Sequence, residues 1–438
     1  MISQTLHEQE RRGRLDLEAL EMAVRRSMHE VGGHLVERLL NTDQGGYQGP
    51  HVPCSKGHEA AFVAYRSKTV VTVLAPVEVS RAYYHCASCG GGVIPKDQAL
   101  DLVGTSLTPG VRRMMGRVGG EEAFAEGRRD LEELAGVVVK TKQVERVAEG
   151  LGEQIEARAR AERQAVLAGK LVPLGGEGPV EKFYIAIDAT GVPVVPKETA
   201  GRAGKGEDGE AKTRDAKLGC VFTQSRLDAK KRPVRDPHST SYVGAIETAE
   251  EFGKRIYAEA VRRGLLQARQ VIVLGDGAPW IWALAEEHFP GALQIVDLYH
   301  AREHLGELAK TLYGRTGKAT TAWRVARYKE LEAGNVEAVV AAMKRTRPRD
   351  ATGREQVRRE IAYFQTNAER MRYAKFRRRG LFVGSGVVEA GCKTIMGQRL
   401  KQSGMRWTVR GANAIIALRC CQVSNRWEEF WEARAASR

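Results

Sequence analysis

Apolar and polar positions follow different periods along this chain, and each change of period marks an expected boundary. Over residues 1–45, apolar side chains recur at three- and four-residue steps among charged ones, which predicts an N-terminal helical arm. Residues 46–110 instead alternate with a period of two between cysteines, which predicts a small β module. The helical period returns over residues 111–170, with Gly136 placed to turn the chain and Thr141 near the start of a second helix. That pattern is typical of a helix-turn-helix segment that binds DNA.

A different pattern begins after the Gly- and Pro-rich stretch LAGKLVPLGGEGPV, which predicts a linker. The run FYIAIDAT, residues 183–190, is almost continuously apolar, as expected of a strand that is buried on both faces. Strand patterns then alternate with helical ones, which predicts an α/β sheet over residues 180–300. Residues 301–375 carry a charged helical pattern almost throughout, and residues 376–438 form a basic C-terminal part.

The composition points to a polyanionic partner. The chain of 438 residues is long enough for two or three domains, and its hydrophobic content of 42% can fill their cores. Its formal net charge of +15 favours nucleic acids, because binding them releases counterions. The polar N-terminus and the lack of an apolar run of about 18–20 residues argue against a signal peptide and a membrane span. We therefore expect a cytoplasmic protein that binds DNA.

The β module carries residues with the spacing of zinc ligands. The seven cysteines of the chain, an odd number, suit metal ligands or reduced thiols better than a disulfide framework. Two ligand pairs, one with three intervening residues and one with two, flank a β-rich segment of 27 residues, and this is typical of a zinc ribbon with one structural Zn²⁺. The expected ligands are Cys54, His58, Cys86 and Cys89. His51 and His85 lie close enough in sequence to replace His58 as the fourth ligand.

Three acidic residues stand at positions where a carboxylate is unusual. Asp188 interrupts a buried apolar strand and Asp276 follows the strand QVIVLG, so both need compensation for burial. Glu389 is the only acidic residue of residues 371–410, among Lys and Arg. Such oxygen ligands suit Mg²⁺ or Mn²⁺, and two of these ions together can clamp a phosphodiester. Each acid also has an ordinary alternative: a strand-end turn, a helix N-cap and an i,i+4 pair with Lys393, respectively.

Basic and polar side chains in two segments are the expected DNA contacts. The start of the second helix of the helix-turn-helix segment can face the major groove with Lys142, Gln143 and Arg146. The basic residues around Glu389 can hold DNA phosphates that its charge would otherwise repel. These residues are Lys393, Arg399 and Lys401.

Six blocks of the sequence follow one another in an order typical of a known family. They are YIAIDATGVPV, TRDAKLGCVFTQ, VIVLGDGAPWIW, IVDLYHAREHL, GSGVVEAGCK and RLKQSGMRWT. These blocks resemble those of bacterial insertion-sequence transposases of the ISKra type, which belong to the DDE superfamily, and the likeness runs through nearly the whole chain. It implies a ribonuclease-H-like catalytic domain with Asp188, Asp276 and Glu389 as catalytic residues and as ligands of two Mg²⁺ or Mn²⁺ ions. It also implies that residues 301–375 are a helical insertion within that domain.

The resemblance further implies the reaction, which is hydrolysis at the transposon ends followed by attack of the freed 3′-hydroxyl on target DNA. Asp297 and His300, in DLYH, resemble a supporting Asp-x-x-His of related DDE enzymes. We expect double-stranded DNA as partner, a homo-oligomer in the DNA complex and association with the bacterial nucleoid when bound.

Two other functions stay open from the sequence. One is a DNA-binding regulator built on the zinc ribbon and the helix-turn-helix, with a catalytically silent C-terminal domain. The other is a ribonuclease-H-like nuclease without strand transfer. The presence of all three acids favours an enzyme over a regulator, and the resemblance favours a transposase over a nuclease.

Overall fold

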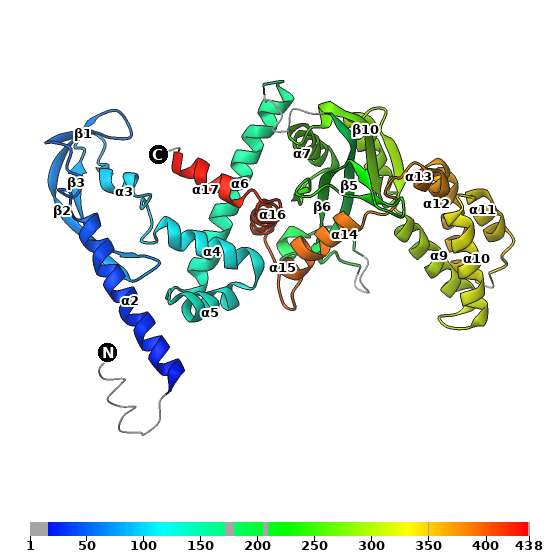
Figure 1. Cartoon of the computed structure of the whole chain (residues 1–438), viewed down its shortest axis with the longest axis horizontal. Helices are drawn as coiled ribbons and strands as arrows, with labels where there is room; N and C mark the ends of the chain where they lie inside the picture. Colours follow the sequence, from blue (N-terminus) through cyan, green and yellow to red (C-terminus); the bar gives the residue numbers. More distant parts are fainter. Residues whose placement is uncertain (1–15, 171–178, 205–208, 349, 437–438) are drawn as a thin grey trace. The chain divides into compact units, whose positions relative to one another are not determined.

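The computed structural model describes residues 16–170, 179–204, 209–348 and 350–436. The chain divides into two compact units, one of Met1–Leu151 with Glu428–Arg438 and one of Gly152–Trp427 (Figure 1). The first part of the predicted N-terminal arm and most of the predicted linker lie outside the described residues. Within the described ranges, no helix combines the length and the apolar character that crossing a membrane requires.

The described part of the first unit begins with α2 (Leu17–Leu40), where the Asp16 carboxylate accepts a hydrogen bond from the Ala19 N–H group (3.1 Å) and so caps the helix. An antiparallel sheet in the order β1-β2-β3-β4 follows. Its strands are β1 (His51–Pro53), β2 (Glu59–Val71), β3 (Pro76–His85) and β4 (Gly92–Val93), and the short helix α3 (Pro95–Ala99) comes next. The period-two pattern of this segment is thus confirmed as a sheet.

Helices make up the rest of this unit. They are α4 (Pro109–Glu121), α5 (Phe124–Ala135), the first part of α6 (Thr141–Leu167) and nearly all of α17 (Trp427–Ala436). Gly136 ends α5 with a φ of 68°, a left-handed conformation that glycine adopts without strain. Val111, Leu131 and Val144 from successive helices pack in one buried cluster. The predicted turn at Gly136 and the helix start at Thr141 are therefore confirmed.

The described part of the second unit contains a five-stranded sheet in the order β11-β10-β5-β6-β9. Its strands are β5 (Val180–Pro193), β6 (Thr213–Gln224), β9 (Ser241–Ala245), β10 (Ala268–Gly275) and β11 (Leu293–Val296). β6 pairs antiparallel with both β5 and β9, whereas β10 is parallel to β5 and β11 to β10. Phe183 to Ile187 of β5 are fully buried, as the continuous apolar run predicts. The α/β sheet is thus confirmed.

Short elements connect these strands. A small hairpin of β7 (Arg226–Leu227) and β8 (Pro233–Val234) lies between β6 and β9. Helix α7 (Ala249–Arg262) leads from β9 toward β10, and α8 (Pro279–His288) joins β10 to β11. The short 3-10 helices η1 (Pro196–Glu198) and η2 (Leu265–Gln267) complete the connections.

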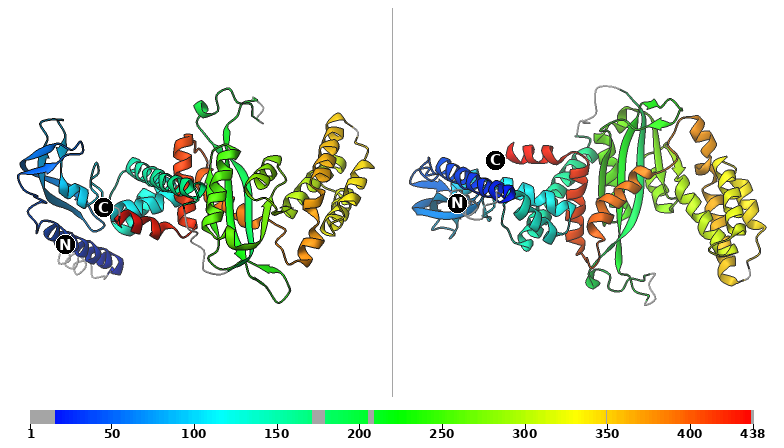
Figure 2. Two further views of the ribbon diagram at one scale, coloured as in Figure 1. Left: turned by 90° about the horizontal axis from the view of Figure 1, so that it is seen from above. Right: turned by 60° about the horizontal axis from the view of Figure 1, so that its bottom comes forward.

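The charged segment after β11 is helical, as its pattern predicts. It comprises α9 (Leu298–Tyr313), α10 (Lys318–Glu332), α11 (Val336–Lys344) and α12 (Ala351–Thr366), followed by η3 (Ala368–Met371) and α13 (Tyr373–Arg378). In both views of Figure 2 the yellow helices α9 to α12 form a bundle of their own beside the green sheet. The chain then forms α14 (Gly386–Gly391), the π-helical η4 (Cys392–Gly397), α15 (Gln398–Leu400) and α16 (Val409–Val423).

Candidate functional site

Asp188 and Asp276 come from neighbouring parallel strands. Asp188 lies on β5, and Asp276 directly follows β10. Leu274 of β10 pairs with Ala186 of β5, so two more residues in the same register bring Asp276 beside Asp188. Because side chains alternate between the two faces of a sheet, both carboxylates point to the same face, at the carboxyl end of β10. That edge of an α/β sheet is where ligands commonly bind.

The pKa of the Asp188 carboxyl is raised because burial disfavours its charged form, and the charge of Asp276 raises it further. Two groups act in the opposite direction: the Cys392 thiol donates a hydrogen bond to the carboxylate, and the Ala189 N–H group donates another at 2.7 Å. The charge of His300 also favours the ionised form. Asp188 is thus a carboxylate whose negative charge the surrounding protein only partly compensates.

Asp276 has one carboxylate oxygen committed to the turn before α8. Its Oδ1 accepts a hydrogen bond from the Ala278 N–H group at 2.8 Å, which resembles the capping role open from the sequence. Its Oδ2 receives no hydrogen bond from the described residues. Gly277 follows with a φ of 98°, a backbone conformation that side chains strongly disfavour. The turn therefore holds Asp276 in place and leaves one oxygen for a ligand.

Glu389 lies on a helix that is anchored at two points of the same edge. Ser385, just before α14, donates hydrogen bonds from its N–H and hydroxyl groups to Asp297, which follows β11. At the other end of α14, Cys392 contacts Asp188. Glu389 lies between these two anchors, four residues after Ser385 and three before Cys392.

The carboxylate of Glu389 itself points elsewhere. Its side chain is 50% exposed, and its Oε1 lies 2.6 Å from the Lys393 Nζ, which is the i,i+4 pair that the sequence left open. The described residues contain one cluster of close potential metal ligands, and the three acids are not part of it. The structure thus brings Asp188 and Asp276 together and holds Glu389 nearby, paired with a lysine.

Asp297 joins two helices. It is 3% exposed, and its Oδ1 accepts hydrogen bonds from the N–H groups of Tyr299 (2.6 Å) and His300 (3.1 Å), which caps α9. Its Oδ2 accepts the hydrogen bonds from Ser385. Both carboxylate oxygens are therefore used within the protein, and this residue supports α14. The His300 ring lies 5.2 Å from that of His304.

Three residues of the helical segment hold the Asp276 turn, and no sequence pattern pointed to them. The Tyr363 hydroxyl of α12 donates a hydrogen bond to the Asp276 carbonyl oxygen at 2.8 Å. Its ring stacks on that of His304 at 4.2 Å, and the His304 Nδ1 lies 2.7 Å from the Glu360 Oε2. All three belong to the charged helical segment, where no pattern sets them apart. Glu360 and Tyr363 of α12 are 84 and 87 residues from Asp276 in the sequence. Only packing brings them to the site.

The zinc ligands predicted from the sequence form a cluster that could hold zinc. The ligand atoms of Cys54, His58, Cys86 and Cys89 all lie within 4.8 Å of one another. The Cys54 Sγ is 3.8 Å from the Cys89 Sγ, and the Cys86 Sγ is 3.8 Å from the His58 Nδ1. Ligands about 2.3 Å from a zinc ion in tetrahedral geometry are about 3.8 Å apart, so this donor set fits Zn²⁺. His51 and His85 are outside the cluster, which leaves His58 as the fourth ligand.

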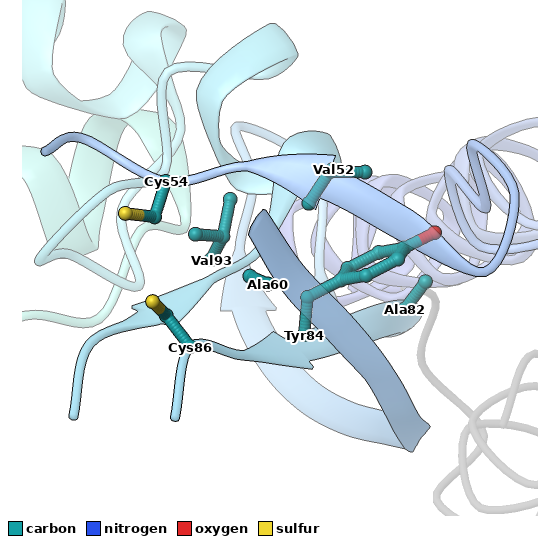
Figure 3. Packing of buried hydrophobic residues seen from close by; sticks show 7 residues of the cluster. All are labelled: Val52, Cys54, Ala60, Ala82, Tyr84, Cys86 and Val93. Atoms are coloured by element: carbon teal, nitrogen blue, oxygen red, sulfur yellow. The ribbon is translucent and has the colours of Figure 1, made fainter. Parts of the chain in front are cut away.

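Two tight turns and a small core build this cluster. The Cys54 N–H group donates to the His58 carbonyl (2.7 Å), and the Gly90 N–H group donates to the Cys86 carbonyl (2.8 Å). The Lys56 N–H group points at the Cys54 Sγ (3.4 Å), and this contact lowers the pKa of Cys54 to about 7. Figure 3 shows the sulfur atoms of Cys54 and Cys86 at one end of the buried cluster around Tyr84.

The residues predicted to contact DNA have different environments. Lys142 and Arg146 are exposed on α6, whereas the Gln143 side chain accepts a hydrogen bond from the Lys140 N–H group (2.8 Å) and so helps to start that helix. Lys393 is exposed and paired with Glu389.

Arg399 corrects our interpretation of the basic segment. It is 0% exposed and lies over the Trp407 ring at 5.0 Å, so this side chain stabilises the core instead of meeting phosphates. Lys401 is exposed, and its Nζ contacts the hydroxyl of Thr190, two residues after Asp188 on β5. Of these two predicted DNA contacts, Lys401 thus lies on the surface beside β5, whereas Arg399 belongs to the core.

Comparison with known proteins finds one family model and several solved structures that are similar to this chain. Residues 247–431 match the model of UPF0236, an uncharacterised protein family, and this segment contains Asp276 and Glu389 but not Asp188. Among solved structures, the Drosophila P element transposase strand transfer complex is similar to this chain, with 8% sequence identity, 73% of this chain and 80% of that chain covered, and a TM-score of 0.24. A TM-score of that size supports no conclusion on fold or function. No curated protein matches the chain.

Proposed function

We propose that this protein is a DNA transposase of the DDE class, which cuts transposon ends by hydrolysis and joins the freed 3′-hydroxyl to target DNA. The observation that carries the proposal is the juxtaposition of Asp188, within β5, and Asp276, at the carboxyl end of the parallel strand β10. The anchored helix α14 carries the third acid, Glu389, close to this edge. The resemblance of the sequence blocks to insertion-sequence transposases supports the same reaction.

The strand order supports a ribonuclease-H-like catalytic domain. Such a domain has an antiparallel meander of three strands, which two parallel strands extend on the far side of the first. Strands β5, β6 and β9 form a meander of this kind, and β10 and β11 add beside β5. The helices α9 to α12 lie between Asp276 and Glu389 in the chain, where the resembling transposases carry a helical insertion.

Asp188, Asp276 and Glu389 are the residues that would hold two Mg²⁺ or Mn²⁺ ions. Burial and the neighbouring carboxylate of Asp276 disfavour the negative charge of Asp188 and so raise its pKa, and a hard divalent cation would compensate that charge. Glu389 fits this ligand set once its carboxylate leaves Lys393. When bound, the ions supply activation of the attacking oxygen and stabilisation of the leaving oxygen.

The other residues of the site position these acids and the DNA. Asp297 holds the start of α14 through Ser385, and Cys392 holds the carboxylate of Asp188 by a hydrogen bond. Lys401, beside Thr190, is placed to bind a phosphate close to Asp188. Lys393, now paired with Glu389, would be available to bind a second phosphate if the Glu389 carboxylate turned to a metal ion. His300, whose charge acts on Asp188, supports the ionised form of that acid.

The N-terminal unit is proposed to recognise the transposon ends. Lys142 and Arg146 are exposed near the start of α6. This helix follows α5 after the turn at Gly136, and a helix-turn-helix segment places such side chains of its second helix in the major groove. The zinc cluster would fix the β module that precedes these helices.

The test is an end-cleavage and strand-transfer assay. The purified protein is incubated in Mg²⁺ or Mn²⁺ with a duplex that carries the terminal repeat of its own element, flanking DNA and a target plasmid. We expect cuts at the repeat boundary that leave a 3′-hydroxyl, and joined products with the plasmid. Specific binding without cleavage would support the regulator instead, and cleavage without joining would support the nuclease.

Tyr363→Phe is expected to slow end cleavage about five- to tenfold without changing DNA affinity. The variant loses the hydrogen bond to the Asp276 carbonyl, a contact of about 1 kcal/mol that keeps the Asp276 turn in place. The Mg²⁺ concentration for half-maximal rate should rise, because a less ordered Asp276 holds the ion less well. The measurement is the cleavage rate as a function of Mg²⁺.

Tyr328→Phe is the matched control for this experiment. The Tyr328 hydroxyl donates to the Arg302 carbonyl (3.0 Å) within the same helical segment but makes no contact with Asp276. It should lose a comparable hydrogen bond with no change in the Mg²⁺ dependence. Equal behaviour of the two variants would show that Tyr363 serves only to stabilise the helices.

A further inference from the structure

The basic C-terminal segment is divided between two opposite ends of the sheet. At one end, the Gly380 carbonyl accepts hydrogen bonds from the Gln224 Nε2 (2.9 Å), at the end of β6, and from the Lys182 Nζ (3.4 Å), near the start of β5. The Phe382 ring then packs 5.3 Å from that of Tyr184 on β5. Helix α13 with its arginines therefore lies at the amino end of β5.

The chain reaches the opposite end three residues later. The Leu298 N–H group donates to the Val383 carbonyl at 2.9 Å, and Ser385 binds Asp297 beyond the end of β11. Asp188 is six residue steps along β5 from Lys182, which at about 3.3 Å per residue is about 20 Å. The basic residues of α13 are thus remote from the carboxylates, although both lie in one basic stretch of the sequence.

The hairpin β7–β8 adds positive charge at the same amino end. It leaves β6 directly after Gln224, and Leu227 lies against Gly380, where an added Cβ would come within 2.7 Å of the Leu227 side chain. Its acid Asp228 accepts hydrogen bonds from the N–H groups of Lys230 (2.9 Å) and Arg232 (2.8 Å) and pairs with the Arg232 side chain. This acid therefore shapes the turn.

The second acid of this region is also committed to the local structure. Asp236 accepts hydrogen bonds from the Ser225 N–H group (3.0 Å) and the Thr223 hydroxyl (2.7 Å). These bonds, and the nearby charge of Arg226, lower the pKa of Asp236, although burial opposes them. Neither acid of the hairpin pairs with Lys230 or Lys231 in the described residues.

The exposed cations of the hairpin and of α13 form what we call the amino-end patch. Its members are Arg226, Lys230, Lys231, Arg232, Arg235, Lys375, Arg377, Arg378 and Arg379. Two of them have an acidic partner in the described residues, Arg232 with Asp228 and Arg377 with Glu332 at 3.4 Å. So many exposed cations on two adjoining elements repel one another unless a polyanion covers them.

We propose that the amino-end patch binds the phosphate backbone of duplex DNA, at a place about 20 Å from the cleaved phosphate and without sequence preference. This inference rests on the proposed function: a transposase acts on DNA, so we take duplex DNA as the polyanion that covers the patch. Long, unpaired Lys and Arg side chains on a hairpin and a helix end suit backbone contacts, which carry no sequence information. The patch would hold a part of the DNA that does not react.

The test compares two full-length variants that lose equal charge. The patch variant carries K230Q, K231Q, R378Q and R379Q. The control carries R315Q, K318Q, K329Q and R345Q, which lie exposed in the helical segment after β11. Binding of a random-sequence duplex of about 40 base pairs is measured in Ca²⁺ over a range of NaCl concentrations. Each lost phosphate contact lowers the slope of log K against log salt by about 0.9, so the patch variant should lose about 3 to 4 in slope.

The patch variant should also bind about 10- to 100-fold more weakly near 0.15 M salt, while the control should follow the unaltered protein. Lys230 and Lys231 of the unaltered protein should become protected from acetylation when the duplex is added. A salt slope of the patch variant equal to that of the unaltered protein would overturn the proposal. So would protection of Lys230 and Lys231 from acetylation by an acidic protein or a single-stranded RNA and not by the duplex. Because no step of this test needs cleavage, an unaltered protein that binds through the patch but does not cut would refute the proposed function alone.

Discussion

Asp276→Asn is expected to abolish end cleavage in Mg²⁺ or Mn²⁺ while DNA binding in Ca²⁺ is kept. The amide keeps the size of the side chain and the hydrogen bond from the Ala278 N–H group, but it removes the charge that would hold a divalent ion beside Asp188. Loss of the ions removes activation of the attacking oxygen and stabilisation of the leaving one, so the rate should fall by several orders of magnitude.

Asp188→Asn and Glu389→Gln should lower the cleavage rate as much as Asp276→Asn, and double variants should be no worse, because the three acids serve one metal cluster. Glu389→Gln should keep or raise the DNA affinity, since it removes a negative charge from a basic surface. Asp215→Asn is the matched control, because Asp215 is an exposed acid on the neighbouring strand β6. Near-normal cleavage by Glu389→Gln would reduce this residue to a surface partner of Lys393.

Thermal unfolding separates lost chemistry from lost folding in these variants. Burial raises the pKa of Asp188 in the folded protein, so the unfolded chain loses this proton at lower pH than the folded one. The contribution of Asp188 to stability therefore falls as the pH rises from the unfolded pKa through the folded pKa, and above both it is unfavourable. Asp188→Asn should consequently unfold at the same or a higher temperature at neutral pH. A lower temperature would attribute its lost cleavage to misfolding.

Cys86→Ser is expected to lose the zinc ion and the order of the β module. The unaltered protein should contain about one zinc per chain, because the four ligand atoms within 4.8 Å of one another fit a tetrahedral site. The buried cluster of this module is small, with Tyr84 as its largest side chain, and modules of this size depend on a metal for folding. The measurements are the metal content per chain and the proteolysis of residues 46–110.

The second unit should stay folded in Cys86→Ser, since it has its own sheet and core. Cys420→Ala is the matched control: this cysteine is buried on α16, far in sequence from the zinc cluster, and its loss should leave the zinc content unchanged. Full retention of zinc by Cys86→Ser would contradict the zinc site.

Local sequence patterns were enough to predict the features that depend on neighbouring residues. The ligand pairs around Cys54 and Cys86 were predictable because tight turns set both their spacing and their geometry, and the turn at Gly136 was predictable from local conformation. The buried strand β5 followed from its apolar run, because burial on both faces leaves no polar position. The helical segment after β11 followed from its period in the same way.

The tertiary structure alone decided which distant residues meet. The register between β5 and β10 puts Asp188 beside Asp276, and the packing of α12 brings Tyr363 to the Asp276 turn. Packing also buries Arg399 against Trp407, although the sequence shows it as one more cation of a basic stretch. The crossing of residues 380–385 over the sheet separates the arginines of α13 from Glu389. A local pattern encodes the period and the turns of a segment, whereas these contacts join segments far apart in the chain and depend on how whole elements pack.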